Sequence, residues 1–387
     1  MDFLSTLSTF GTILGVVTIL GTFLDYMLNH NSEHPNRARN LRVTTALSAI
    51  VLLVILAAQY EVTPAASLLT LMPGVPFPGS TLRSGCHVSI YALPHIPATP
   101  SQAVAHPGLA GQSLDISGSS VLYGLFAGAG RQFDAANGTT TVVGKLDSSQ
   151  GLSNLAAGQS QIGLTDFYQR DDPDASLQSV HDLKDYHVAV APLTLLVSSD
   201  LKDVVWNLTT EQIVAIFSGS ITDWRMVGGP DERITVFNRP LGSGTRLNFE
   251  KYVLGSSLPK DDLRARNTQA LVQLMTKTRG AIGYAATNAI FQYPGKVYPI
   301  CIDGYGATTA SIVSGSYVFW SYEHAYVSQP KGQALPPVVK SYLDYVCSHA
   351  FQTADLPNVG FLRISQLSPA AMQTHEEEYP AAVPCEE

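Results

Sequence analysis

Residues 239–245 read Arg-Pro-Leu-Gly-Ser-Gly-Thr and lead into a run, ending at Val253, whose apolar spacing predicts a helix. Small and hydroxyl side chains at a helix N-terminus leave its unpaired backbone N–H groups open to a ligand, and the helix dipole favours a negative one. Arg239 adds a planar guanidinium that matches the oxygens of a tetrahedral anion. The stretch therefore predicts an anion site formed by Arg239 and the start of this helix.

Two other turns of small residues stand before predicted helices. Residues 118–120 (Gly-Ser-Ser) precede a helix expected over 121–135, and residues 147–151 (Asp-Ser-Ser-Gln-Gly) precede a short one over 152–157. Each turn alone is explained as an ordinary helix cap. Three such turns would form one site only if the fold brings them together, which the sequence does not show.

An acidic residue, Asp166, follows Gly-Leu-Thr at the end of a short β-like run. A carboxylate repels an anion unless that anion carries a proton. Hydrogen phosphate carries one and sulfate at neutral pH does not, so an aspartate in the site would discriminate against sulfate. Taken alone, Asp166 is explained as a turn or cap residue.

From residue 113 onwards the pattern is that of an α/β protein, with short β-rich runs alternating with helical ones. Thr209 and Gln212 form a capping-box pattern at the start of one helix. The β-rich runs are 140–143, 187–197, 234–237 and 297–302, and the helical runs are 121–135, 210–217, 245–253, 268–277 and 337–349. This alternation predicts a sheet covered by helices.

The N-terminal region predicts a membrane hairpin. The chain has 387 residues, 45% hydrophobic and only 14% charged, whereas soluble domains average about 25% charged residues. Residues 10–28 and 43–60 are each long and apolar enough to span a bilayer, and the loop between them holds three arginines. Basic loops stay in the cytoplasm, so the N-terminus and everything after residue 60 are expected outside. The alternative, a secretory signal peptide, lacks its basic start, because no Lys or Arg occurs in the first 36 residues.

Two extensions flank the expected α/β domain. Residues 61–112 are rich in proline and predict a stalk or an extended wrap over the domain surface. Residues 369–387 carry five glutamates and predict a mobile or loosely packed acidic tail. The four cysteines lie on the side expected to be oxidising, which leaves three possible pairings open. We expect both extensions to be tied to the domain; the candidates are Cys86, Cys301, Cys347 and Cys385.

Several functions are disfavoured. A net charge of −8 argues against a nucleic-acid partner. The sequence contains no nucleophile elbow, no phosphate-binding loop of the nucleotide-hydrolase type and no paired histidine spacing for a metal. We therefore expect no enzyme activity, no cofactor and no metal; a hydrolase using Ser243 has no general base beside it in the sequence.

Taken in order, these motifs resemble the phosphate-binding proteins of bacterial high-affinity phosphate ABC transporters. The resemblance covers about two thirds of the chain, and it is carried by 118–120, Asp166, 208–224 (LTTEQIVAIFSGSITDW), 239–245 and 280–284 (GAIGY). It implies a two-lobed type II periplasmic-binding-protein fold over 113–368. The first lobe would hold 113–190 and 288–368, the second 191–287, and the chain would cross between them near 189–196 and 282–289.

The resemblance also implies a set of phosphate ligands. Ser120 and Ser148 would donate hydroxyls, Val121 a backbone N–H, and Asp166 would accept the phosphate proton. Arg239 would pair with the oxyanion, and the last helix start would supply Ser243, Gly244 and Thr245. The second turn departs from the family's usual Gly-Ser-Ser-Gly-Gly, which places Asp147 beside the site.

The predicted function is a membrane-anchored, two-pass extracytoplasmic protein that captures inorganic phosphate between its lobes. Its expected partners are membrane lipid and an ABC permease or another membrane complex. A second hypothesis is an accessory subunit of a larger membrane complex that keeps the binding-protein fold for a structural role, with the GxxxG of residues 11–15 packing against partner helices.

Overall fold

The computed structural model describes residues 99–375, except 256, 258, 260–262 and 292, together with residues 383–385. The predicted membrane hairpin over 1–60 and most of the predicted linker lie outside these ranges. Among the residues described, no helix combines the length and the apolarity that crossing a bilayer would need.

A mixed sheet runs through the described residues in the strand order β2-β1-β3-β9-β4-β7-β6. The first three strands are parallel, and β9 joins β3 and β4 in antiparallel register. The strands of this first half are β1 (Ser113–Ser119), β2 (Thr140–Leu146), β3 (Ile162–Thr165), β9 (Trp320–Ser328) and β4 (Leu183–Ser198). Helices cover both faces of this half, as the α/β alternation predicts.

Strand β4 joins the two lobes. Residues 183–187 and 189–192 pair with β9, with a register shift at Val188. The last residues of β4 pair with the strands of the second lobe, β7 on one side and β8 on the other. The second lobe contains β5 (Asn207–Leu208), β6 (Thr235–Val236), β7 (Ala281–Ala286) and β8 (Val297–Ile302). The predicted first crossing near 189–196 falls on this strand.

The predicted second crossing near 282–289 is wrong. Strand β8, which the sequence prediction assigned to the first lobe, pairs with residues 195–198 of β4 inside the second lobe. The chain returns to the first lobe only at β9. Alternation of helix and strand does not distinguish the lobes, because both are α/β units and only strand pairing assigns β8.

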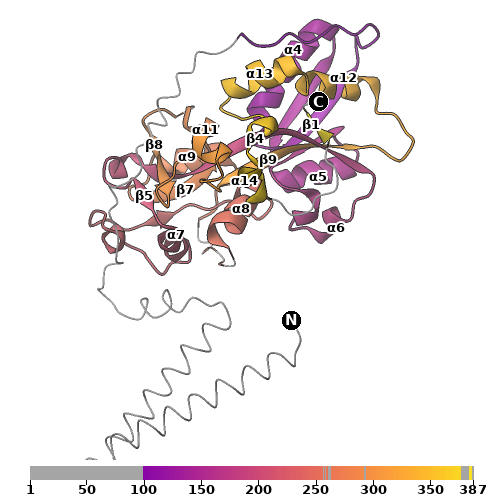
Figure 1. The fold of residues 1–387 in the computed structure, drawn as a ribbon. Coiled ribbons are helices and arrows are strands. Elements are labelled where there is room, and N and C mark those ends of the chain that lie inside the picture. The colour runs from indigo at the N-terminus through magenta and orange to yellow at the C-terminus, as the bar shows by residue number, and fades with distance from the viewer. Residues whose placement is uncertain are drawn as a thin grey trace, which may run out of the picture. The chain divides into compact units, whose positions relative to one another are not determined.

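Helices surround both halves of the sheet (Figure 1). In the first lobe, α4 and α12 lie together over β1 and β2, with α13 beside α12, while α5 contacts β1 and β3 with α6 beside it. These helices are α4 (Tyr123–Asn137), α5 (Ser148–Ala156), α6 (Ala175–Gln178), α12 (Pro337–Val346) and α13 (His349–Asn358). Those of the second lobe are α7 (Thr210–Phe217), α8 (Gly244–Phe249), α9 (Thr268–Met275), α10 (Asn288–Phe291) and α11 (Thr309–Val313).

Helix caps explain two of these boundaries. The predicted capping box of α7 is confirmed, with the Thr209 and Gln212 side chains each bonded to the other's backbone. The helix predicted over 337–349 is confirmed as α12 but ends at Val346, three residues earlier than predicted. The Ser348 hydroxyl accepts a hydrogen bond from the backbone N–H of Phe351 at 3.3 Å and so starts α13 after a break.

The proline-rich linker ends as a wrap on the first lobe. The backbone N–H of Ser101 donates to Asp355 at 2.9 Å, and that of His106 donates to Asn137 at 2.7 Å. Leu109 is buried. Of the two predicted arrangements, the extended wrap therefore holds for residues 99–112.

The acidic tail is packed where the structure describes it, so the prediction of a loose tail is wrong there. Helix α14 (Pro369–Gln373) buries Ala371, and the His375 ring stacks on Trp320 with centroids 3.5 Å apart. Strand β10 (Val383–Pro384) pairs with β4. A few small or aromatic residues provide this packing. The prediction of a loose tail was based on the glutamates that dominate the composition of the segment, and composition does not show such contacts.

A disulfide fixes the end of the tail. Cys385 is bonded to Cys347, which follows α12, with their α-carbons 4.3 Å apart. This confirms that the tail is tied to the domain. Cys301, in β8, is also disulfide-bonded, and Cys86 lies outside the described residues.

Candidate anion-binding site

The second predicted turn begins α5 and carries Ser148 as the first residue of that helix. Asp147 is its N-cap, and the Asp147 carboxylate accepts a hydrogen bond from the backbone N–H of Gln150 at 2.8 Å. The extra acidic residue in this turn is therefore a helix cap. Gly151 lies so close to Gly118 that a β-carbon on Gly151 would stand 2.8 Å from the Gly118 α-carbon. This contact brings α5 against the end of β1.

The third turn begins α8 and meets the second one. Ser243 is the N-cap, its hydroxyl accepting from the backbone N–H of Arg246 at 3.4 Å. A β-carbon on Gly244 would stand 2.7 Å from both the Asp166 β-carbon and the Ser148 hydroxyl oxygen. The starts of α5 and α8 come from different lobes and touch here, so the fold supplies the convergence that the sequence left open.

Asp166 lies at the centre of this contact, directly after β3. Its carboxylate accepts hydrogen bonds from Ser119, and from Thr245 at 3.3 Å, and its backbone N–H donates to Ser148 at 3.2 Å. Asp166 is buried. Burial raises the pKa of this carboxyl, while the hydrogen bond from Ser119 and the charge of Arg239 act in the opposite direction.

Arg239 is buried beside Asp166, with only 1% of its surface exposed. Its Nη1 donates to the Thr268 hydroxyl at 3.0 Å, and its backbone carbonyl accepts from Arg246 at 2.7 Å. Its Nε has no hydrogen-bond partner among the described residues. A buried guanidinium with an unused N–H is expected to meet an acceptor that comes from outside the chain.

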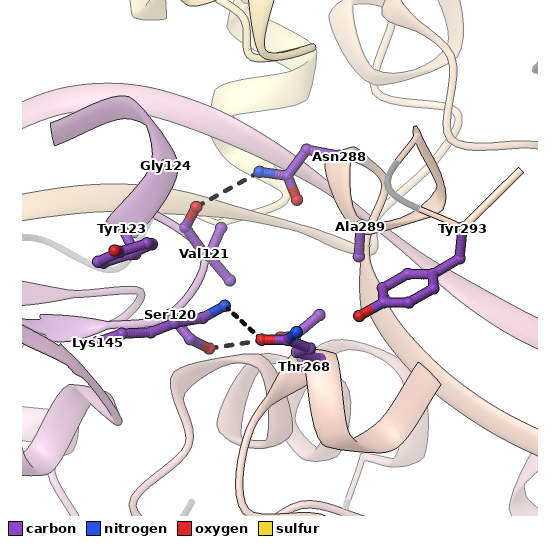
Figure 2. Close-up of a pocket in the computed structure, with 10 residues that line it drawn as sticks. Ser120, Val121, Tyr123, Gly124, Lys145, Thr268, Asn288, Ala289 and Tyr293 are labelled. Atoms are coloured by element: carbon purple, nitrogen blue, oxygen red, sulfur yellow. Dashed lines mark hydrogen bonds between the residues drawn. The ribbon is translucent and has the colours of Figure 1, made fainter. Parts of the chain in front are cut away.

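Ser120 and Val121 line a cavity of about 150 Å³ next to this cluster (Figure 2). The Ser120 hydroxyl lies 3.4 Å from that of Thr268. The backbone N–H of Val121 donates to the Ser119 hydroxyl at 3.1 Å. The turn at 118–120 precedes α4 but does not cap it, because that helix begins at Tyr123 and its N-cap residue, Leu122, makes no side-chain hydrogen bond.

Four residues of this region were not predicted from the sequence. Ser119, rather than its neighbour Ser120, donates a hydrogen bond to Asp166. Thr268, at the start of α9, holds Arg239. Lys145 lies at the cavity, where burial and then the nearby Arg239 lower its pKa. Glu323 in β9 is fully buried and lies next to the Asp166 carboxyl, whose pKa it affects. An acidic residue inside the aromatic run 320–326 (WSYEHAY) was the one available sequence signal for Glu323.

The cluster is rich in hydrogen-bond donors and contains the Asp166 carboxyl as an acceptor. Arg239, the hydroxyls and the two helix starts would stabilise negative charge. Asp166 would accept a hydrogen bond from a ligand that carries its own proton. Ser243 uses its hydroxyl to cap α8, which gives the serine a structural role.

A second polar cluster lies elsewhere in the first lobe, where strand pairing brings together Asp185, His187 and His324. Their donor atoms lie within 4.8 Å of one another, so these residue types could hold a metal ion, which the sequence spacing did not predict. His324 is hydrogen-bonded through Nδ1 to both Asp185 oxygens, at 3.0 and 3.1 Å. His187 Nε2 lies 3.3 Å from the same carboxylate. Hydrogen bonding to the Asp185 carboxylate accounts for these contacts.

Several known proteins are similar to this chain in sequence and fold. Residues 102–350 match the model of the PBP superfamily domain. The phosphate-binding protein PstS of Bacillus subtilis is 31% identical over 256 residues, which are 66% of this chain and 82% of the relative. A crystal structure from Clostridium perfringens, solved with bound phosphate as a candidate phosphate ABC transporter substrate-binding protein, superposes with a TM-score of 0.57 at 25% identity, over 65% of this chain and all of that one.

A phosphate transport receptor of Vibrio cholerae has a TM-score of 0.51 at 22% identity, over 64% of this chain and 99% of that one, and supports the fold alone. The two-lobed arrangement described above is that of the type II periplasmic-binding-protein fold, as the motifs predicted. The superfamily model spans most of the α/β domain, and the B. subtilis relative is matched over most of its own length. The chain belongs to the PBP superfamily and, within it, to the family of PstS phosphate-binding proteins.

Proposed function

We propose that this protein captures inorganic phosphate between its two lobes. The observation that carries the proposal is the buried pair of Arg239 and Asp166, in which a guanidinium keeps an unused N–H beside a carboxylate that faces donors. Phosphate suits both groups, because its oxygens accept from Arg239 and its proton donates to Asp166. Sulfate has no proton to offer at neutral pH. The match to phosphate-binding relatives supports the same ligand.

The proposed ligands are those of the sequence prediction, arranged by lobe. The first lobe would supply Ser120, Val121 through its N–H, Ser148 and Asp166; the second would supply Arg239, Ser243, Gly244 and Thr245. Their support is the contact between the starts of α5 and α8. Because the global charge is −8, the attraction for an anion would be local, from Arg239 and the helix starts.

The setting of this function is proposed from the sequence. The apolar runs at 10–28 and 43–60 would anchor the chain in the membrane, with the binding domain on the extracytoplasmic side. There the protein would deliver phosphate to an ABC permease as a binding protein without enzyme activity. The disulfide between Cys347 and Cys385 is consistent with that compartment.

Titration calorimetry on the full chain in mild detergent, after removal of all phosphate, tests the function. We expect one phosphate per chain, and Arg239→Ala should weaken binding by about 2–5 kcal/mol because it leaves the buried anion and Asp166 without their cation. Arg225→Ala is the control, since Arg225 is an exposed arginine paired with Asp223. Absence of phosphate binding to the wild-type chain would reject the proposal. A stable complex without any permease, together with absent binding, would instead support the accessory-subunit hypothesis.

A further inference from the structure

Glu323 and Asp166 form a contact between two buried carboxyl groups. The antiparallel register of β3 and β9 pairs Thr165 with His324. Asp166 directly follows β3, so the continuation of this register places Asp166 opposite Glu323, and side chains at opposite positions lie on the same face of a sheet. Each carboxyl group acts on the pKa of the other, so the two lie close enough to share a hydrogen bond when one of them carries a proton.

Glu323 has little to stabilise a negative charge. It is fully buried, and its Oε1 accepts from the Ser321 hydroxyl at 2.6 Å. No N–H or hydroxyl of the described residues donates to its Oε2. Two ionised carboxylates in contact inside a protein repel each other, and a hydrogen bond between them requires a proton on one.

The proton belongs on Glu323. Asp166 accepts hydrogen bonds from Ser119 and Thr245 and lies near Arg239, all of which favour its ionised form. Among the described residues, the hydroxyl of Ser321 is the one donor to Glu323. Burial and the neighbouring Asp166 charge raise the pKa of Glu323 well above its usual value, which agrees with this placement.

We propose that Glu323 is a positioning residue for anion selection: it stays protonated, donates a hydrogen bond to the Asp166 carboxylate, and keeps Asp166 ionised as an acceptor for the proton of the ligand. This inference rests on the proposed phosphate function and adds a residue to it. If Asp166 were itself protonated, it would become a donor, and sulfate would fit the site as well as phosphate. Glu323 would thus maintain the discrimination that Asp166 makes.

Other ionisable groups surround the pair and have to be considered in any pH experiment. Arg239 faces Asp166, and Lys145 lies close to Arg239. His324, the next residue in β9, is bonded to Asp185 and projects to the opposite face of the sheet. None of these groups is altered when Glu323 is replaced, so a matched pair of Glu323 variants isolates its contribution.

Glu323→Gln and Glu323→Met form this pair. Glutamine keeps an N–H donor for Asp166, whereas methionine has a similar length and no donor. We measure Kd for phosphate and sulfate by calorimetry on the full chain in detergent. The sulfate-to-phosphate Kd ratio should stay within about threefold of wild type in the Gln variant. In the Met variant it should fall by about tenfold to a hundredfold, the effect of one charge-assisted hydrogen bond.

Sulfate also serves as a probe of Asp166 protonation, because sulfate itself does not gain or lose a proton over the range of the experiment, roughly pH 5.5 to 8. Loss of the Glu323 donor raises the pKa of Asp166, so sulfate affinity in the Met variant should increase as the pH falls. In wild type and in the Gln variant it should change little. Equal selectivity in all three chains, or the same loss in Gln and Met, would overturn the proposal.

Infrared spectroscopy of the ligand-free chain gives a readout that needs no phosphate binding. The carbonyl stretch of a buried protonated carboxylic acid should be present at neutral pH in wild type and absent in Glu323→Gln. If this band is present and phosphate does not bind, the proposed function fails while the protonated pair stands. If phosphate binds selectively and the band is missing, the present inference fails alone.

Discussion

Gly244, at the start of α8, faces Asp166 so closely that a β-carbon on Gly244 would stand 2.7 Å from the β-carbon of Asp166. The two residues come from opposite lobes, so this distance belongs to the closed arrangement of the cleft. The φ angle of Gly244 is not positive, and glycine is required here by the close approach alone. The backbone geometry of the helix start would tolerate alanine in an open cleft.

Gly244→Ala is therefore expected to weaken phosphate binding without unfolding either lobe. The added methyl group would hold the lobes apart, and the ligands of one lobe would no longer reach the anion held by the other. Affinity should fall by about tenfold or more, as for other contacts that need sub-ångström placement, while the melting temperature changes little. Gly128→Ala is the control, because a β-carbon there meets only the Arg131 side chain at 3.9 Å. A stable Gly244→Ala protein with wild-type affinity would contradict the closed-cleft interpretation.

Thr268→Val tests how Arg239 is held. The substitution preserves shape and removes the hydroxyl that accepts from Arg239 at 3.0 Å. Phosphate affinity should fall by about 1.5–3 kcal/mol, the range for a hydrogen bond to a charged group. Thr276→Val, at the other end of α9, removes a hydroxyl that donates to the Gln273 carbonyl within the same helix and should leave affinity unchanged. Equal affinities of the two variants in calorimetry would show that Thr268 does not position the guanidinium.

Replacing both cysteines of the tail disulfide by serine should destabilise the first lobe. The bond closes a loop with a sequence separation of 38, and its loss is expected to lower the free energy of unfolding by up to about 4 kcal/mol through the entropy of the unfolded chain. Urea unfolding followed by tryptophan fluorescence measures this, since all three tryptophans lie in the binding domain. Phosphate affinity should persist in the folded protein. An unchanged unfolding midpoint would mean that α14 and β10 hold the tail without the disulfide.

His375 should make the protein less stable in acid. Burial lowers its pKa to about 3 from the ordinary value of 6.5. The folded state then keeps the ring neutral where the unfolded chain binds a proton, so stability declines as the pH falls from 6.5 towards 3. The slope contributed by one such proton is about 1.4 kcal/mol per pH unit.

His375→Gln should remove that slope, because glutamine can still donate to the Trp320 carbonyl that His375 Nε2 contacts at 3.0 Å. The measurement is the urea unfolding free energy at a series of pH values. His349→Gln removes an exposed histidine on α13 and serves as the comparison. If both variants show the wild-type slope, the acid sensitivity has another origin.

Local patterns in the sequence predicted much of the framework because they depend on short-range chemistry. The capping box at Thr209 and Gln212 forms within one turn of helix, and β8 occupies the predicted run at 297–302. The Arg239-to-Thr245 segment predicted an anion site for the same reason. A helix N-terminus and a guanidinium group attract anions through local charge, which does not depend on the rest of the fold. The order of these motifs along the chain was also sufficient to identify the family.

Relations between distant residues needed the tertiary structure. The lobe that contains β8, the packed tail and the contact between Gly244 and Asp166 all depend on which strands pair and which helices meet. Glu323 lies 157 positions from Asp166 in the chain, and only the pairing of β3 with β9 brings the two carboxyl groups together. The sequence by itself determined which groups can bind an anion. The tertiary structure alone decided which of them meet in a buried place, where the scarcity of water makes protonation and hydrogen bonding selective.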